Sequence, residues 1–371
     1  MTLWTLEPRD TLVIRDGRPM IDAGGQMPGL PVPFPSSTAG FLRTRAGSDA
    51  HGRWDGTLTS DQAKAIPVLG PWLVELDDAG KVIDHLVPCP RDAVAWSAAG
   101  GDGHDIRPLA PGAFNAGEAS DMPAELRPLF LHNAKKEKPT RLPSFVSFDG
   151  FVADWLAKPA AKTAVVKGLA GLPKEWRTHV AINPDTQTAE DGALFSLEHL
   201  RFVTSDGRHH RRFALAALAT HNGIRAGAYP YAGERRISFL HATQQQPPTC
   251  PKAVVDAVAA SGRARVLLIT PAMFTAGWRP TRLCAGATLV AAAVSRPDVV
   301  SGWDLAQPNG GCPKPTRRLA PAGSVYWLQL DGDAAARRAW VAKHWWQPVN
   351  DDDVDDREGF GLAAIGTWED A

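Results

Sequence analysis

Apolar and polar positions alternate over short stretches, a pattern that predicts many strands and few long helices. LWTLEP, Leu3 to Pro8, alternates apolar and polar residues, which predicts a strand. Other runs are short, apolar and bounded by turn residues, which is typical of buried strands. These runs are IPVLGPWLVEL (66–76), RVLLITP (265–271), ATLVAAAVS (287–295) and SVYWLQL (324–330). FALAALATHNGI (213–224) fits either a buried strand or a helix.

Four segments have the composition and ends of helices. SSTAGFLRTRAG begins at Ser36, where Ser36 and Thr38 are suitable N-cap residues. AVVDAVAASG (253–262) ends at a glycine, as many helices do. The remaining two are FVADWLAK (151–158) and AAARRAWVAKHWW (334–346).

Three further stretches stand out. In residues 179–202 two apolar arms flank a polar centre with Asp185, Thr186 and Gly192, which predicts a long hairpin or a projecting loop. Residues 97–120 are rich in Gly, Ala and Asp and predict a surface insertion. The run DDDVDD (351–356) predicts a solvated loop or an acidic face for a basic partner, rather than a magnesium site, and we expect it away from any RNA.

Composition narrows the class of protein. A chain of 371 residues with 44% hydrophobic character has enough apolar side chains for two packed units. Forty basic residues balance forty acidic ones, so a site for a polyanion has to be local. The chain starts without a secretory signal, and its longest apolar run (283–294) is too short for a bilayer. We therefore expect a soluble, cytoplasmic protein without a membrane partner.

Catalytic and metal-binding signatures are not found in the sequence. GxxxxGK[ST], HExxH and GxSxG do not occur, and the four cysteines lie too far apart for a zinc ribbon. The adjacent His209 and His210 point apart on any regular element, so they are poor acid–base partners. His179 precedes an apolar arm, where a structural or RNA-contacting role is favoured over chemistry. No catalytic residue, metal or cofactor is predicted.

Basic residues cluster beside glycine and proline at four places. Glycine lets a backbone approach a phosphate closely, and arginine adds a two-pronged donor. Any one cluster reads as an ordinary solvated turn, but four of similar chemistry favour a phosphate-rich ligand. The clusters are Arg15 and Arg18 around Gly17, Arg43 and Arg45 after the Ser36–Thr38 cap, Arg235 and Arg236 after Gly233, and Lys314, Arg317 and Arg318 in the stretch 301–327.

An ordered set of motifs over nearly the whole chain resembles one known family. The motifs are PRDTLVIRDGRPM, PFPSSTAGFLRT, HVAINPDTQTAEDGALFS, AYPYAGERR, GWDLAQPNGGCPKPTRRLAPAGSVYWLQL and GFGLAAIGTW. In this order they resemble the third subunit of the Cmr effector complex of type III-B CRISPR systems, within the RAMP superfamily. Each motif alone is weak evidence, whereas the ordered set is specific.

The resemblance implies an α+β fold of two ferredoxin-like (RRM-type) domains with long inserted loops. We place the domains at residues 1–175 and 176–371, the second with a projecting hairpin (176–205) and a glycine-rich loop (359–366). It also implies a non-catalytic subunit that holds the 5′ repeat-derived tag of the CRISPR RNA. Such a subunit docks on the large polymerase/cyclase subunit and adjoins the backbone RAMP subunit that cleaves target RNA.

Motif by motif, the resemblance implies a set of RNA contacts. The GGER-like motif has Ala232 in place of its first glycine, which puts close backbone approach there in question. The implied residues are Arg15, Arg18, Ser36, Ser37, Thr38, Arg43, His179, Thr186, Gln187, Thr188, Gly233, Arg235, Arg236, Lys314, Arg317, Arg318, Gly359 and Gly361.

Two other functions stay open at this point. Some RAMP proteins are metal-independent endoribonucleases that mature guide RNA with a histidine, and His179 is the candidate here. The other reading is a scaffold that makes no RNA contact, in which the basic loops are only solvated turns.

Overall fold

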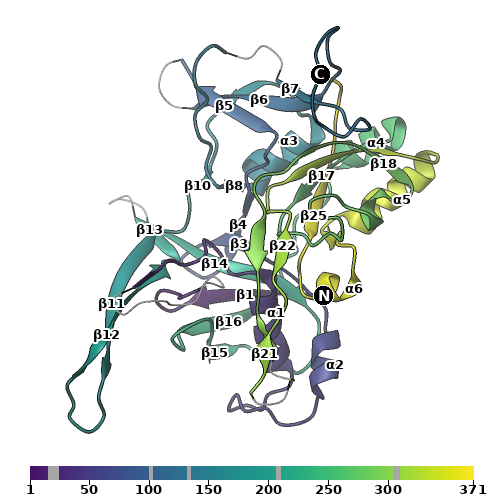
Figure 1. Ribbon diagram of the computed structural model, residues 1–371. Coiled ribbons are helices and arrows are strands. Elements are labelled where there is room, and N and C mark those ends of the chain that lie inside the picture. The colour runs from purple at the N-terminus through teal and green to yellow at the C-terminus, as the bar shows by residue number, and fades with distance from the viewer. Residues whose placement is uncertain (16–24, 100–102, 132–134, 206–209, 305–306, 308–309) are drawn as a thin grey trace.

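The computed structural model describes residues 1–15, 25–99, 103–131, 135–205, 210–304, 307 and 310–371. The fold is α+β and rich in strands, with several largely antiparallel sheets (Figure 1). Arg18 lies outside the described residues, so its predicted RNA contact is not placed. None of the helices in the described ranges combines the length and apolar character needed to cross a bilayer.

The largest sheet has nine strands in the order β10-β8-β4-β3-β14-β1-β16-β15, with β13 paired to β14. The segment 213–224 belongs to it as a strand, β14, rather than as a helix. The bounds are β1 Thr2–Pro8, β3 Val68–Leu76, β4 Val82–Pro88, β8 Phe145–Ser147, β10 Gly168–Leu169, β13 Val203–Ser205, β14 His210–Ala219, β15 Gly227–Pro230 and β16 Ile237–Thr243.

The predicted boundary between residues 175 and 176 passes through this sheet. β1 pairs on one side with β14 and on the other with β16, so strands from both predicted domains share one ladder. Hydrogen bonds between strands this far apart in the chain leave no trace in local residue patterns. The number of ferredoxin-like domains stays a prediction.

The second sheet has five strands in the order β18-β23-β17-β25-β24 and carries the helices α4 and α5. α4 ends as predicted at Gly262, whose φ of 71° suits glycine. The bounds are α4 Lys252–Ser261, β17 Arg263–Leu268, η2 Arg282–Cys284, β18 Ala287–Ala293, β23 Val325–Leu330, α5 Ala334–His344, β24 Gln347–Pro348, α6 Asp353–Arg357 and β25 Leu362–Thr367.

Smaller sheets surround these two. The predicted insertion at 97–120 is partly wrong, because residues 104–111 form strand β6, whose Ile106 is fully buried. The bounds are β5 Ala93–Ser97, β6 His104–Pro111, β7 Leu129–Leu131 and β9 Lys162–Ala164; β2 Gln26–Met27, β11 Lys174–Ile182 and β12 Ala189–Leu200; β19 Asp298–Val300 with β22 Arg317–Leu319; and β20 Trp303–Asp304 with β21 Cys312–Pro313. The remaining helices are α1 Pro35–Ala46, α2 Ser60–Ala65, η1 Phe148–Val152 and α3 Ala153–Ala157.

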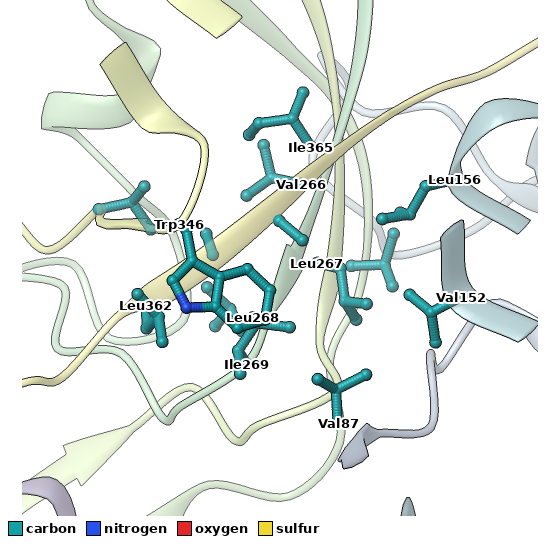
Figure 2. Packing of buried hydrophobic residues seen from close by; sticks show 14 of the residues in the cluster. Val87, Val152, Leu156, Val266, Leu267, Leu268, Ile269, Trp346, Leu362 and Ile365 are labelled. Atoms are coloured by element: carbon teal, nitrogen blue, oxygen red, sulfur yellow. The ribbon is translucent and has the colours of Figure 1, made fainter. Parts of the chain in front are cut away.

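An apolar core joins the two large sheets. Val87 at the end of β4 and Leu156 on α3 pack in one cluster with Leu267 of β17 (Figure 2). Trp346 and Leu362 continue the same cluster on the side of β25. Because one cluster spans both sheets, the two are held in a common interior.

Candidate nucleic-acid interface

A cleft of about 400 Å³ lies where three distant chain segments meet. The segment after β1 provides one wall, one face of α1 another, and the turn between β15 and β16 the third. Its lining residues are Val13, Ile14, Arg15, Pro33, Ser37, Gly40, Phe41, Thr44, Arg45, Pro230, Tyr231, Ala232 and Gly233. Three of the predicted contacts, Arg15, Ser37 and Gly233, therefore lie together although they come from three motifs.

Helical spacing decides which side of α1 faces the cleft. Its buried residues recur every three or four positions, so the opposite face, with Ser37, Phe41 and Arg45, is left for the cleft. These buried positions are Pro35, Thr38, Ala39, Leu42, Arg43 and Ala46.

The start of α1 differs from the predicted cap. Phe34 occupies the N-cap position, Pro35 follows it, and no side chain caps the helix. The predicted caps Ser36 and Thr38 were wrong, because the helix begins earlier, at Pro35, whose ring fixes the helical φ and which lacks one of the N–H groups left unpaired at a helix start. The buried hydroxyl of Thr38 lies 2.9 Å from that of Tyr231 and so links α1 to the turn after β15.

Among the described residues that line the cleft there are two cations, Arg15 and Arg45, and no acidic residue. The Arg45 guanidinium lies over the ring of Tyr229, 4.7 Å from its centre, and 5.9 Å from the centre of Phe41. Arg15 is exposed and has no ion-pair partner within the described part of the chain. An anion in the cleft would meet both positive charges, and none of the lining residues that the structure describes is a competing carboxylate.

Arg43 has a structural role instead. Its side chain is buried, with Nε donating to the Ile66 carbonyl at 3.1 Å and Nη2 to the Arg357 carbonyl at 2.8 Å. This burial speaks against the predicted RNA contact, which stays a prediction. Arg45, which the predicted contacts missed, is the arginine of α1 in the cleft. Spacing alone gave no signal, because Arg45 follows the buried Leu42 by three positions just as Arg43 follows the buried Ala39 by four.

The turn after Tyr231 brings Gly233 to the cleft wall. The N–H of Gly233 donates to the Val13 carbonyl at 2.8 Å, which ties the turn to the segment after β1. Ala232, Glu234 and Arg235 all have left-handed backbone angles, with φ of 63°, 57° and 49°. Arg235 is exposed and has no ion-pair partner among the described residues.

The left-handed angle of Ala232 leads to a stability prediction. An L-residue with a Cβ pays about 1–2 kcal/mol in this region, which glycine does not. We therefore expect Ala232→Gly to stabilise the protein by about 1 kcal/mol, after the greater freedom of glycine in the unfolded chain is deducted. Urea unfolding measures the difference, and a destabilised variant would contradict the prediction.

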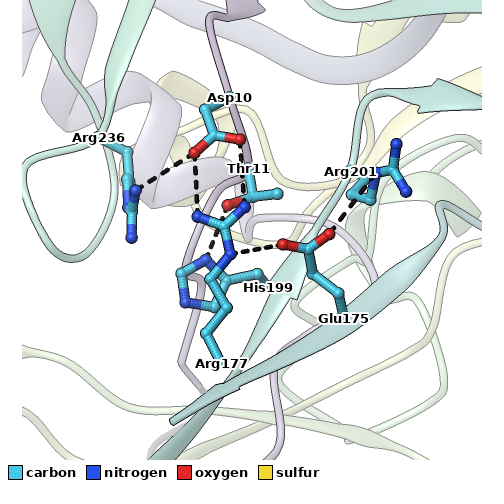
Figure 3. A network of polar contacts seen from close by, with 7 residues as sticks. All are labelled: Asp10, Thr11, Glu175, Arg177, His199, Arg201 and Arg236. Atoms are coloured by element: carbon cyan, nitrogen blue, oxygen red, sulfur yellow. Dashed lines mark hydrogen bonds and ion pairs between the residues drawn. The ribbon is translucent and has the colours of Figure 1, made fainter. Parts of the chain in front are cut away.

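Next to this turn, a polar network holds Arg236. Asp10 lies between Arg177, whose Nη1 is 3.0 Å from Oδ2, and Arg236, at 3.4 Å from the same oxygen (Figure 3). Glu175 binds Arg177 from the other side and lies 3.7 Å from Arg201. The hydrogen bond from Arg177 lowers the pKa of Asp10 below its usual value. Arg236 is thus paired in this structure, and RNA would have to compete with Asp10 for it.

His179 forms part of a stack of rings at the base of the β11–β12 hairpin. Its ring lies parallel to those of Phe195 and His199, with centres 5.4 and 5.8 Å away. His199 is fully buried, its Nδ1 is 2.8 Å from the Thr11 hydroxyl, and burial lowers the pKa of its imidazole. Sequence reasoning missed His199, because the two histidines meet only through the register of the hairpin.

The three cations Lys314, Arg317 and Arg318 are not one cluster. Arg317 donates from Nη1 to Oδ1 of Asp355 at 2.7 Å, whereas Arg318 lines a separate cavity of about 540 Å³. Arg317 and Arg318 are neighbours in strand β22, whose successive side chains alternate between two faces. Asp355 of the acidic run in α6 thus pairs with a residue predicted to contact RNA, so the expectation that the run lies away from RNA and the predicted contact of Arg317 do not fit together in this structure.

Gly359 and Gly361 are buried supports between the sheets. A Cβ on Gly359, whose φ is 86°, would come within 2.2 Å of the Gly70 carbonyl oxygen. A Cβ on Gly361 would lie 2.6 Å from Oδ1 of Asn350. Both glycines serve close packing, and their burial speaks against the predicted RNA contacts.

Comparison with known proteins gives a family match over nearly the whole chain. Residues 4–368 match the family model described as CRISPR-associated protein (Cas_Cmr3). The chain is similar to a chain in the cryo-EM structure of the type III-B Cmr-beta complex bound to cognate target RNA and AMPPnP, with 13% identity, a TM-score of 0.48 and coverage of 88% of this chain and 86% of that one. A chain of Cmr-beta bound to cognate target RNA alone gives 14% identity, a TM-score of 0.47 and the same coverage. No curated protein matches the chain.

Proposed function

The chain belongs to the Cmr3 family of CRISPR-associated proteins and is a subunit of the type III-B Cmr effector complex; from this premise we propose that it holds the 5′ repeat-derived tag of the guide RNA without catalysing a reaction. It would do so in the cytoplasm, docked on the large polymerase/cyclase subunit and beside the backbone RAMP subunit that cleaves target RNA. One observation carries the RNA-binding role: Arg15, Ser37 and Gly233 converge on one cleft from three motifs.

The chemistry of the cleft suits a short single-stranded segment. Arg15 and Arg45 offer two charged donors to phosphates, and the described part of the lining contains no acidic side chain. Phe41 lines the cleft and offers a flat partner for an unstacked base, whereas Tyr229 lies under Arg45 and is not a lining residue. Stacking of this kind contributes about 1–3 kcal/mol per base.

A salt titration tests this proposal. We expect Arg15→Ala/Arg45→Ala to bind a single-stranded RNA with the repeat tag more weakly than the wild type. The slope of log affinity against log salt should flatten by about 1.4, since each lost phosphate contact on a single strand accounts for about 0.7. Fluorescence anisotropy of the labelled RNA measures both quantities.

The matched control removes two exposed cations from α5, Arg338→Ala/Lys343→Ala, which changes the net charge by the same amount. Its slope should stay close to that of the wild type. Equal slopes for the cleft variant and the wild type would reject the cleft as the RNA site. Equal losses in both variants would indicate a general charge effect.

The fold places a second histidine, His199, beside His179, but the two do not form the acid–base pair that an endoribonuclease would need. His179 and His199 are stacked face to face, with 6° between their ring planes. His199 is fully buried and faces the Thr11 hydroxyl, so it cannot reach a phosphate in a bound RNA. The burial of His199, the histidine that the described part of the chain places beside His179, supports the non-catalytic proposal.

A further inference from the structure

The cavity that Arg318 lines shares no lining residue with the cleft at α1. Its volume of about 540 Å³ lies within the range of about 300–1,000 Å³ that is usual for small-molecule sites. Residues from four segments line it: 122–129, 277–278, the end of β18 with the residues after it (292–297), and 318–319 in β22. Most of these side chains are apolar, so we call it the apolar pocket.

The walls of the apolar pocket are fastened to the rest of the fold. Glu125 and Arg279 form an ion pair of 2.5 Å, which joins the first wall to the loop that carries Trp278. The Trp278 carbonyl accepts the Tyr326 hydroxyl at 2.7 Å, and Asp351 accepts backbone N–H groups at both ends of the same loop. Because these contacts fix the walls, the pocket is formed before a ligand enters.

Strand β18 is the last strand of its sheet, and its end borders the pocket. A free sheet edge is where an extended peptide of a partner would pair. Here the N–H of Arg127 donates to the Val290 carbonyl at 2.8 Å, so a segment of the same chain already bonds to that edge. What remains is a hollow of small-molecule size rather than a groove for a strand.

Two arginines are the charged residues among the lining positions that the structure describes, and one of them is free for a ligand. Arg127 uses all three side-chain nitrogens: Nε donates to the Gly112 carbonyl, Nη2 donates to the Pro111 carbonyl, and Nη1 pairs with Asp370 at 2.7 Å. Arg318 is exposed, and no ion pair holds it within the described ranges. A negatively charged group in the pocket would therefore be drawn to Arg318.

We propose that the apolar pocket binds a small amphipathic anion, which has a compact aliphatic or aromatic body and one carboxylate or sulfonate group. The body lies against Leu126 and Trp278, which removes apolar surface from water on both sides. Arg318 holds the anionic group with two parallel hydrogen bonds. A nucleotide fits less well, because its base edges and sugar hydroxyls would be buried against apolar walls without partners. This ligand site goes beyond the guide-RNA role and does not depend on it.

Dye binding to the full chain tests the site. We expect anilinonaphthalene sulfonate, an aromatic sulfonate that fluoresces in apolar surroundings, to bind at a single saturable site and to be displaced by decanoate, an aliphatic carboxylate. Arg318→Ala should weaken the binding of both probes by about tenfold, because it removes the charged donor. The control Arg338→Ala removes an exposed cation from α5 and should bind like the wild type. A wild-type chain without a saturable site from which decanoate displaces the dye would overturn the inference.

A second variant tests the apolar wall. Trp278→Ala removes an indole that is 38% exposed but keeps the carbonyl that accepts the Tyr326 hydroxyl. We expect it to weaken the binding of both probes by about tenfold. The control Trp54→Ala removes an indole that is 47% exposed and lies outside the pocket, and should bind like the wild type. Thermal unfolding checks that each variant is folded. Folded Trp278 and Arg318 variants that bind both probes as the wild type does would overturn the inference.

A side chain of a neighbouring subunit is the other occupant that an apolar pocket could receive, and the assembled complex distinguishes the two. Trp278→Ala/Arg318→Ala would be co-expressed, as the full chain, with the other subunits and guide RNA, and should be incorporated like the wild type. Equilibrium dialysis with radiolabelled decanoate should find less decanoate bound to the variant complex than to the wild-type complex. Weakened incorporation, or equal decanoate binding by the two complexes, would indicate that a partner fills the pocket and would overturn the inference. The tag-RNA titration of the cleft variant is a separate measurement, so either proposal can fail alone.

Discussion

Replacement of Asp92 with alanine is expected to destabilise the protein by about 3–5 kcal/mol, because it leaves a buried positive charge without a partner. Asp92 and Arg265 are 0% and 1% exposed, and they form an ion pair between the segment after β4 and strand β17. The other oxygen of Asp92 accepts the indole N–H of Trp155 on α3 at 3.0 Å. One carboxylate thus joins three parts of the fold.

Urea unfolding of the full chain measures this effect, with Asp256→Ala as its control. Asp256 pairs with Lys252 on the exposed side of α4, where such pairs contribute little, so that variant should unfold like the wild type. Asp92→Leu/Arg265→Met removes both buried charges and should recover much of the lost stability. A loss for Asp92→Ala no larger than that for Asp256→Ala would contradict the prediction.

Gly359→Ala is expected to cost about 3 kcal/mol or more of stability, although the motif suggested an RNA contact there. Gly359 has a φ of 86°, and an added Cβ would lie 2.2 Å from the Gly70 carbonyl oxygen. Alanine is strained at this left-handed angle, and its Cβ would also clash with Gly70. Because the clashing oxygen belongs to the backbone, it cannot rotate away as a flexible side chain could. The Gly359 carbonyl also accepts the Thr270 hydroxyl at 2.8 Å, so a shift would break a buried bond.

Unfolding and RNA binding together separate the two roles of this glycine. Gly171→Ala is the control, since its Cβ would meet no atom within 4 Å, and its stability should be close to that of the wild type. For Gly359→Ala we expect lower stability but an unchanged RNA affinity per folded molecule. A variant of normal stability with weakened RNA binding would restore the predicted RNA contact.

Local patterns were sufficient for many of the elements. The alternation in β1, the glycine end of α4 and the two arms of the β11–β12 hairpin all depend on residues close together in the chain. Backbone preferences and the periodicity of burial act over a few residues, so they can be read without the fold. The order of motifs also indicated the Cmr3 family, which the family match confirmed.

The roles of the charged residues depend on neighbours from distant parts of the chain. Arg236 is paired by Asp10 across 226 residues, and Arg317 by Asp355 across 38. A glycine–arginine motif looks the same whether its arginine faces solvent, as Arg235 does, or is held by a carboxylate. Charge in a motif therefore indicated a phosphate ligand only in general terms, while pairing determines which cations are free to bind one.

Helix α1 at the cleft shows the same contrast between what local sequence predicts and what distant neighbours determine. The sequence of α1 predicted a helix with two arginines, but its spacing did not distinguish Arg43 from Arg45. That Arg45 lies over Tyr229 and near the wall formed by Gly233 depends on the pairing of β1 with β16, whose residues are more than 200 positions apart. Local sequence determines elements because propensity and periodicity are short-range; the site forms only when long-range strand pairing brings those elements together.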